Sequence, residues 1–287
     1  MRMEKRICDL HTHSIFSDGT DTPERVVDLA VEAGLSAVAL TDHNTVSGLE
    51  RFTEYAADKP IDIVPGIEFS TEHNGQELHI LGLFVQPTSY RAITDYTKID
   101  DERKEASNID LAQKLNDNGY LVDYQAIKSA TPDGKVNRAL FATALVESGY
   151  YSTNDDAFAT VLSEKHGWYV RPERISSLET IEFIRSIGAV PVWAHPLFHV
   201  DYETCEAFLP IAKAHGLIGI ETEYSLYSEA DTAFSKELCR KFGMLESGGS
   251  DYHGRRKRDI SIGKGKGNLA IPYSFYEDLR RAAERTL

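Results

Sequence analysis

The chain has 287 residues, of which 41% are hydrophobic and 26% are charged. A chain of this length and hydrophobic content can bury a sizeable core, so we expect one large α/β domain, alone or with a small second domain. The formal net charge of −14 argues against a protein that binds nucleic acid through a generally cationic surface, but it leaves room for a local basic patch.

The cysteines and the hydrophobic segments indicate the compartment. Cys8, Cys205 and Cys239 form no CxxC pair and their number is odd, which in a chain of this length indicates reduced thiols. No apolar run approaches the roughly 18 residues of a membrane span, and the basic N-terminus lacks the hydrophobic stretch of a signal peptide. We therefore expect a cytoplasmic protein without membrane association, and no sequence feature indicates an obligate protein partner.

Apolar segments alternate with helical patterns in the N-terminal part of the chain. Thr22 is the expected N-cap of the first helix, and the Asn74-Gly75 dipeptide predicts a hairpin-like turn between the last two strands. In chain order the patterns predict a strand at residues 7–10, a helix at 22–34, a strand at 35–44, a helix at 45–57, and strands at 61–70 and 77–85.

Residues 98–176 interrupt this alternation, because four helical patterns follow one another there without a convincing strand. We interpret them as an inserted helical module. The alternation then resumes, and about seven strands in all predict a parallel barrel or a doubly wound sheet. Neither a GxGxxG nor a Walker motif accompanies the strands, which weakens a nucleotide-cofactor interpretation. The later helices are expected at residues 177–187, 203–215, 229–242 and 274–286, and the later strands at 188–196, 217–224 and 243–253.

Potential metal ligands recur where the strands end. In a (β/α) barrel the carboxyl ends of the strands share one face, on which active sites are built. Imidazoles and carboxylates without thiolates suit Zn, Mn or Fe, and nine ligands exceed the needs of one ion, so two or three divalent metals that share a bridging carboxylate are expected. The candidates are His11, His13, Asp18, His43, Glu68, His79, His195, Asp251 and His253.

For each of these residues taken singly, a purely structural role is an alternative to metal binding. A lone buried histidine is more often a hydrogen-bonded core residue than a ligand. If the nine residues were not ligands, however, most of them would each need a separate structural explanation. For the other histidines we expect no functional role, and we expect them to face solvent or loops: His73, His166, His199 and His215.

In this order the motifs DLHTHSIFSDG, TDHN, GIEFS, LHILG, AHP and GSDYHG resemble those of the PHP (polymerase and histidinol phosphatase) superfamily. The resemblance covers roughly residues 6–100 and 177–270. It implies a distorted seven-stranded (β/α) barrel with two or three metals. The domains would be a metallo-phosphoesterase barrel at residues 1–97 and 177–287 and an inserted helical substrate-binding module at 98–176.

Within the superfamily the chain is most similar to 3′,5′-nucleotide bisphosphatases and 5′-to-3′ exoribonucleases. Their insertion typically holds a Gly-Arg-Pro-His-Ile-Ala-like run, which NRALFATALVESGY replaces here. Arg138 matches the arginine of that run, whereas Asn137, Ala139 and Leu140 stand for its glycine, proline and histidine. This departure leaves the exact substrate open.

The resemblance also implies a distribution of ligands. His11, His13, Glu68 and Asp251 would hold the first metal, and Glu68 would bridge to a second metal. His79 and His195 would complete the second site, and Asp18, His43 and His253 would hold a third metal. Histidinol phosphatases of the family often have histidine at the position of Asp18, so this residue disfavours histidinol phosphate.

The implied mechanism is hydrolysis of a phosphate ester by a metal-activated hydroxide. Glu68 and Asp251 would act as ligands of the catalytic metals, and His195 or a metal-bound water would protonate the leaving group. Asp9 and Asp42 are candidates for orienting the imidazoles, with exposed strand-end acids as the alternative.

Cations and aromatic rings in the insertion are candidates for substrate contacts. Arg138, Lys165 and Arg171 could hold a phosphate, and Trp168 or Tyr169 could stack on a base; solvated helix ends and interdomain packing are the alternatives. The basic segment 254–267 follows the last ligands and could attract an oligonucleotide, or it could be a solvated loop. Its cations are Arg255, Arg256, Lys257, Arg258, Lys264 and Lys266.

The sequence thus favours a metal-dependent phosphoesterase acting on a small phosphorylated nucleotide or a short RNA end. A histidinol-phosphate-type or other metabolite phosphatase is one alternative. An amidohydrolase-like C–N hydrolase is another, but such enzymes usually rely on a bridging carbamylated lysine or a glutamate, and no lysine stands at a strand end. A non-catalytic metal-binding PHP-like module is the third, and it would be expected to have lost ligands, whereas all nine positions are filled.

Overall fold

The computed structural model describes residues 6–131 and 136–285. The chain forms two compact units, one of residues 1–94 and 174–287 and the other of residues 95–173. The second unit overlaps the insertion predicted at residues 98–176. None of the described helices has the combined length and apolar character needed to span a bilayer.

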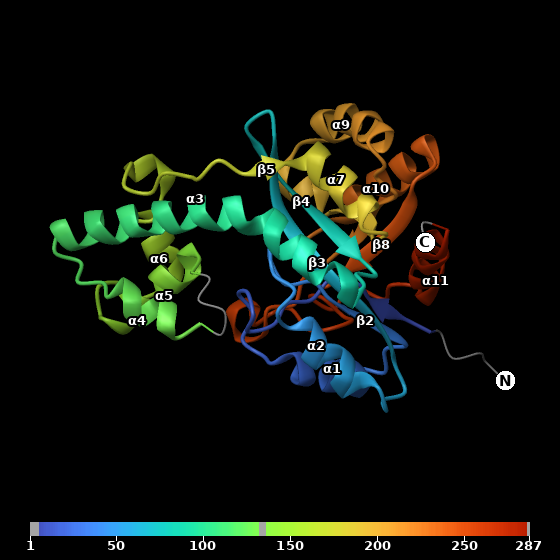
Figure 1. Ribbon diagram of the computed structural model, residues 1–287, viewed down its shortest axis with the longest axis horizontal. Coiled ribbons are helices and arrows are strands. Elements are labelled where there is room, and N and C mark those ends of the chain that lie inside the picture. The colour runs from blue at the N-terminus through green and yellow to red at the C-terminus, as the bar shows by residue number, and fades with distance from the viewer. Residues whose placement is uncertain (1–5, 132–135, 286–287) are drawn as a thin grey trace. The chain divides into compact units, whose positions relative to one another are not determined.

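The first unit contains a curved sheet in which seven strands follow one another around a nearly closed barrel (Figure 1). The backbone N–H of Leu10, directly after the first strand, donates to the carbonyl oxygen of Gly248 in the last strand at 3.1 Å, so the two ends of the sheet meet. The predicted PHP-type barrel is confirmed. In sheet order the strands are β1 (Cys8–Asp9), β2 (Ala37–Leu40), β3 (Asp62–His73), β4 (Gln76–Leu83), β6 (Val190–Ala194), β7 (Gly219–Tyr224) and β8 (Leu245–Gly249), and β5 (Ile175–Ser176) pairs with β3.

One strand runs against the expected parallel order. β4 is antiparallel to both β3 and β6, because the Asn74-Gly75 turn joins β3 directly to β4. Both turn residues have positive φ, 51° and 78°, as the tight turns that reverse a chain require. As a consequence His79 lies in the first half of its strand and not at its end, and it pairs with Ser70 and Ala194 of the neighbouring strands.

Helices surround the strands of this unit (Figure 1). The predicted N-cap of the first helix is confirmed, because the side chain of Thr22 accepts a hydrogen bond from the backbone N–H of Arg25. The three cysteines are buried free thiols. The helices are α1 (Pro23–Glu32), α2 (Leu49–Ala56), η1 (Pro87–Ser89), α7 (Ser177–Ser186), α8 (Pro196–His199), α9 (Tyr202–Ala214), α10 (Glu229–Phe242), η3 (Gly254–Lys257) and α11 (Tyr273–Glu284).

The barrel core consists of strand residues packed against the last helix. Leu81, Val192 and Ala194 of the sheet lie fully buried together with Leu279 of α11. This packing holds the strands rigidly, so the residues at their ends keep fixed positions.

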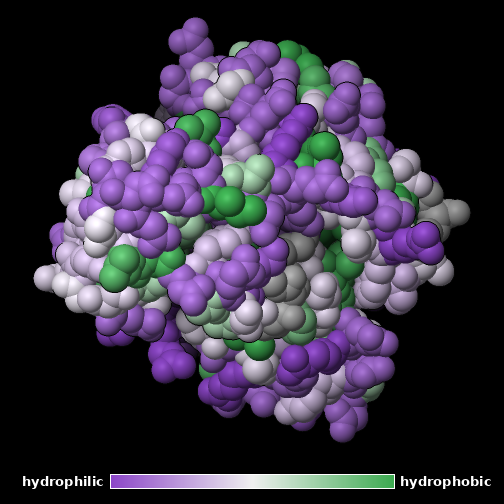
Figure 2. All heavy atoms as spheres, turned by 60° about the vertical axis from the view of Figure 1, so that its left-hand side comes forward, coloured by the Kyte–Doolittle hydropathy of each residue, from purple (hydrophilic) through white to green (hydrophobic). Residues whose placement is uncertain are grey.

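The second unit is helical, as predicted, and the residues described within it form no strand. Leu111, Leu115, Phe141 and Leu162 belong to a core of its own. On the face drawn in Figure 2 hydrophilic residues predominate and hydrophobic residues form small separate groups. The helices are α3 (Tyr90–Asp117), which begins before the unit, α4 (Tyr124–Ser129), α5 (Arg138–Glu147), α6 (Asn154–Ala159) and η2 (Glu164–His166).

Candidate active site

The first strand brings two histidines to the rim of the barrel. His11 and His13 follow β1, and Thr12 between them forms a parallel β-bridge with Tyr252. Alternate residues of such an extended chain point to the same side, so both imidazoles face the site, fully buried. A Cβ atom at Gly249 would overlap the backbone of His11, which explains why glycine ends the neighbouring strand β8.

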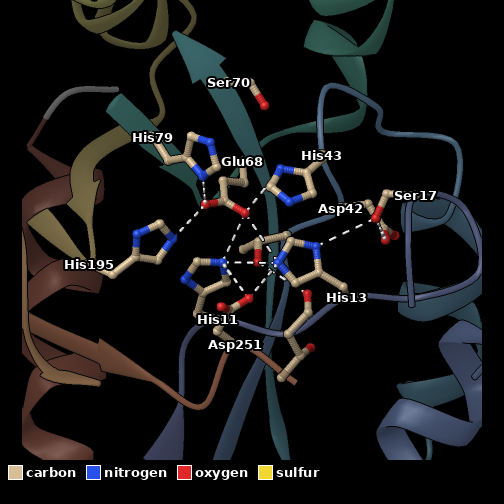
Figure 3. A network of polar contacts seen from close by, with 12 residues as sticks. His11, His13, Ser17, Asp42, His43, Glu68, Ser70, His79, His195 and Asp251 are labelled. Atoms are coloured by element: carbon tan, nitrogen blue, oxygen red, sulfur yellow. Dashed lines mark hydrogen bonds and ion pairs between the residues drawn. The ribbon is translucent and has the colours of Figure 1, made fainter. Parts of the chain in front are cut away.

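These two histidines converge on two carboxylates (Figure 3). Nε2 of His11 lies 3.0 Å from Nε2 of His13, and the same two atoms lie 3.0 and 3.1 Å from Oε2 of Glu68. Oδ1 of Asp251 lies 3.3 Å from Nε2 of His13. Ligand atoms bound at about 2.1 Å to one ion are about 3.0–3.4 Å apart, so this set has the dimensions of a first coordination sphere.

The other oxygen of Glu68 faces a second group of ligands. Oε1 lies 2.8 Å from Nδ1 of His79 and 3.0 Å from Nε2 of His195. The antiparallel direction of β4 brings His79 to this rim, since the first half of an antiparallel strand lies beside the carboxyl end of its neighbour. Glu68 therefore points its two oxygens at two different sets of imidazoles, which is the geometry of a bridging carboxylate.

A third group lies beside the first. Oδ1 of Asp18 lies 3.1 Å from Nε2 of His253 and 3.9 Å from Nε2 of His43. His13 belongs to the same group of possible ligands. All nine predicted ligands thus lie in one cluster, but the groups of possible ligands overlap, since His43 also groups with Glu68 and His79, and their division among three metals stays a prediction. Their individual roles as metal ligands stay predictions.

Carboxylates held in the ionised form stand among the imidazoles of the cluster. Burial opposes the ionisation of Glu68, but the imidazoles of His43 and His11 outweigh it and hold the pKa of Glu68 well below its usual range. Burial also disfavours a charged His13, but Asp251 and Glu68 raise the pKa of His13 to about 9. Carboxylates buried in this way stabilise any cation placed between them.

The donor atoms themselves fit divalent cations. Nδ1 of His43 is buried without a hydrogen-bond partner among the described residues, although it lies 3.2 Å from Oε2 of Glu68. A neutral imidazole has one lone pair on its ring nitrogens, so His43 can offer an ion either Nδ1, beside Glu68, or Nε2, beside Asp18. Imidazole and carboxylate donors without thiolates suit Zn, Mn and Fe.

Glu221 of β7 belongs to the site, and the sequence interpretation missed it. Its side chain is fully buried, Oε1 lies 3.0 Å from Nδ1 of His11, and Oε2 accepts the backbone N–H of His195 at 2.7 Å. A carboxylate that holds Nδ1–H turns Nε2 of the ring toward a metal. An acidic residue inside an otherwise buried strand was the available signal.

The two acids that were predicted to orient imidazoles are buried and accept hydrogen bonds from loop groups. Asp9 accepts the backbone N–H groups of Ser250 and Gly263 at 2.8 and 2.7 Å. Asp42 accepts the hydroxyl hydrogens of Ser14 and Ser17 at 2.6 and 2.7 Å. Both therefore fix the loops that carry ligands. Asp42 also reaches an imidazole indirectly, because the hydroxyl of Ser17 lies 3.5 Å from Nδ1 of His13, whereas the contacts of Asp9 are with backbone amides.

The prediction that His199 faces solvent or a loop is wrong. Its ring lies 4.7 Å from that of His79 and 5.2 Å from that of His195. Nε2 of His199 is buried without a hydrogen-bond partner among the described residues, and burial lowers its pKa to about 3. The short helix α8 starts at the site and carries His199 back toward it.

The predicted substrate-binding cations all lie in the second unit. The guanidinium of Arg138 stacks 4.1 Å from the ring centre of Tyr169, and both Arg138 and Arg171 pair with Glu164, at 3.8 and 3.0 Å. Lys165 is exposed. Because Arg138 covers Tyr169, which is 7% exposed, this ring belongs to the core of the unit. Their contacts with substrate stay predictions.

Several known proteins of similar length are related to this chain, among them the following three. A 5′-3′ exoribonuclease of Haemophilus influenzae is 29% identical over 246 residues, which are 85% of this chain and 89% of the relative. A phosphoribosyl 1,2-cyclic phosphate 1,2-diphosphodiesterase of Eggerthella lenta is 30% identical over 262 residues (89% and 97%). A 3′,5′-nucleoside bisphosphate phosphatase of Chromobacterium violaceum is 28% identical over 256 residues (88% and 90%).

A solved structure and a family model complete the comparison. The structure of a protein from Bifidobacterium adolescentis, assigned as a metal-dependent phosphoesterase, matches with a TM-score of 0.85 over 97% of this chain and 98% of that chain. At 24% identity this similarity shows the common fold. The model of the PHP domain matches residues 9–165. With its barrel and its cluster of imidazoles and carboxylates, the chain belongs to the PHP domain family and is a metal-dependent phosphoesterase.

Proposed function

We propose that the substrate is a small phosphorylated nucleotide, such as a nucleoside 3′,5′-bisphosphate, or the end of a short RNA. The names of the relatives refer to RNA, to a nucleoside bisphosphate and to a phosphoribosyl cyclic phosphate. These substrates share a phosphate ester on a pentose, and this shared chemistry supports the proposal. The structural observation that carries it is the bridging geometry of Glu68 between two sets of imidazoles.

We further propose that two or three divalent ions, Mn, Zn or Fe, bind to the nine ligands. When bound, such ions lower the pKa of water and stabilise the charge on phosphate oxygens. The chain itself holds the ligands in place. Glu221 orients His11 through Nδ1, and the hydroxyl of Tyr224 donates to Oδ2 of Asp251 at 2.8 Å, so the other oxygen of Asp251 faces the cluster.

The bridging position also bears on the competing hydrolase class. C–N hydrolases of this kind bridge their metals with a carbamylated lysine or a glutamate, so Glu68 alone fits both classes, and the phosphoester-cleaving relatives aligned over most of their length favour phosphoester chemistry. The cyclic phosphodiester is the second candidate substrate, because the relative with that activity is aligned over 97% of its own length.

The test is hydrolysis by the Mn-loaded protein, measured as phosphate release from the phosphomonoesters and by chromatography of the cleaved products for the RNA and the cyclic phosphate. The substrates are adenosine 3′,5′-bisphosphate, AMP, histidinol phosphate, a short 5′-phosphorylated RNA and phosphoribosyl 1,2-cyclic phosphate. The proposal expects the highest kcat/KM for the bisphosphate or the RNA, with the metal-stripped protein as an inactive control. A clear preference for histidinol phosphate, or activity on none of the five with metals bound, would overturn it.

A further inference from the structure

One cation of the basic segment 254–267 reaches the metal cluster. Lys257 is the last residue of η3, and its Nζ donates to Oδ2 of Asp251 at 2.6 Å. Other cations of the segment lie elsewhere: Lys266 pairs with Asp259 at 2.7 Å, and Arg258 is exposed. Lys257 is therefore distinct from the general positive charge of the segment.

Lys257 does not compete with the expected ligand role of Asp251. Oδ1 of Asp251 faces Nε2 of His13 at 3.3 Å, whereas Oδ2 accepts from both Lys257 and Tyr224. Asp251 is also held at its backbone, with a positive φ of 55° and its N–H donating to the carbonyl oxygen of His11 at 2.9 Å. A residue kept in such a conformation is well fixed, so the ammonium beside it has a defined position.

The ammonium group of Lys257 has N–H donors that are available to a ligand. A lysine carries three N–H donors, and the hydrogen bond of Lys257 that the described residues show uses one of them. The side chain of Lys257 is 34% exposed, against 5% for Asp251, so an incoming molecule can reach it. The ion pair with the buried Asp251 holds this ammonium beside the cluster.

The charges explain what such a site would bind. A lysine near two or three divalent ions is repelled by them, and Asp251 offsets only part of that repulsion. A phosphate dianion placed between the ions and the ammonium would bring attraction to both. Lysine binds phosphate as a point charge, and charge-assisted hydrogen bonds of this kind are strong.

We propose that Lys257 is a catalytic residue that donates its free N–H groups to a non-bridging oxygen of the phosphate to be cleaved. Resting on the proposed function, the inference adds a protein cation from the barrel itself to the metals that hold the substrate. The same contact would stabilise negative charge on the phosphate oxygens while the bond to the leaving group breaks.

The experiment measures binding and not turnover, so that it stays informative if the proposed nucleotide substrates fail. Inorganic phosphate is titrated calorimetrically into the Mn-loaded full chain, and metal content is measured by mass spectrometry. The proteins are the unaltered chain, Lys257→Met, Lys257→Arg, and Arg258→Met as the matched loss of an exposed cation nearby.

We expect Lys257→Met to keep its metals and to bind phosphate about tenfold or more weakly, as the loss of a charge-assisted hydrogen bond predicts. Lys257→Arg should recover most of the affinity, and Arg258→Met should bind phosphate as the unaltered protein does. Unchanged affinity in Lys257→Met with full metal content would overturn the proposal. Loss of metal from Lys257→Met would also overturn the proposal, because Lys257 would then act through Asp251. Absence of phosphate binding by the unaltered Mn-loaded protein would overturn it as well.

Discussion

Replacing Glu221 by glutamine tests whether the buried carboxylate behind His11 tunes the metal site. The side chain accepts two hydrogens, one from Nδ1 of His11 at 3.0 Å and one from the backbone N–H of His195 at 2.7 Å. An amide of the same shape offers one acceptor oxygen, and its NH₂ group would face the second donor. The substitution therefore removes a negative charge and leaves one buried donor unsatisfied.

The expected loss has two parts. Changing a carboxylate that orients a metal-bound histidine typically weakens metal binding about 10–100-fold, or about 1.4–2.7 kcal/mol. A buried N–H without a partner costs about 1–3 kcal/mol of folding stability. Glu221→Gln should thus lower both the Mn affinity and the melting temperature of the metal-free protein.

The assay is a competition for Mn against a chelator of known affinity, together with thermal unfolding of the metal-free and Mn-loaded protein. Glu223→Gln is the matched control, because Glu223 lies on the same strand but pairs with Lys236 of α10. It should change Mn affinity less than twofold, the scale of a partly exposed ion pair. Unaltered Mn affinity in Glu221→Gln would refute the role assigned to Glu221.

Three further predictions concern the ligands, the substrate and the hairpin. His13→Ala and Asp251→Ala should each abolish turnover and reduce bound metal while the circular dichroism spectrum stays native, and full activity in either variant would remove that residue from the site. Arg138→Ala should raise KM for a bisphosphorylated nucleotide at least tenfold with little change in kcat, and an unchanged KM would end its candidacy. Gly75→Ala should lower the free energy of unfolding by about 1 kcal/mol, since alanine is strained at φ 78°; denaturant titration measures this, and an equal or higher stability would contradict the turn geometry.

The sequence alone was sufficient to predict the role of residues whose type and spacing within one short segment are informative. His11 and His13 stand two residues apart after a short apolar strand, and that spacing places both on one side of an extended chain. The convergence of distant ligands such as Glu68 and Asp251 also followed, because strands that alternate with helices expose their ends on one face. Thr22 before Pro23 identified the start of the first helix for an equally local reason.

Only the tertiary structure decided which buried groups meet. The Asn74-Gly75 turn was recognised, but the antiparallel course of β4, and hence the route by which His79 reaches the site, depends on how β4 fits between β3 and β6. Glu221 lies in a strand that carries no ligand motif, and its partners are far away in sequence. His199 and Lys257 differ from solvated residues of the same type only because α8 and η3 turn back to the cluster. Such contacts join segments distant along the chain, and periodicity within one segment does not encode them.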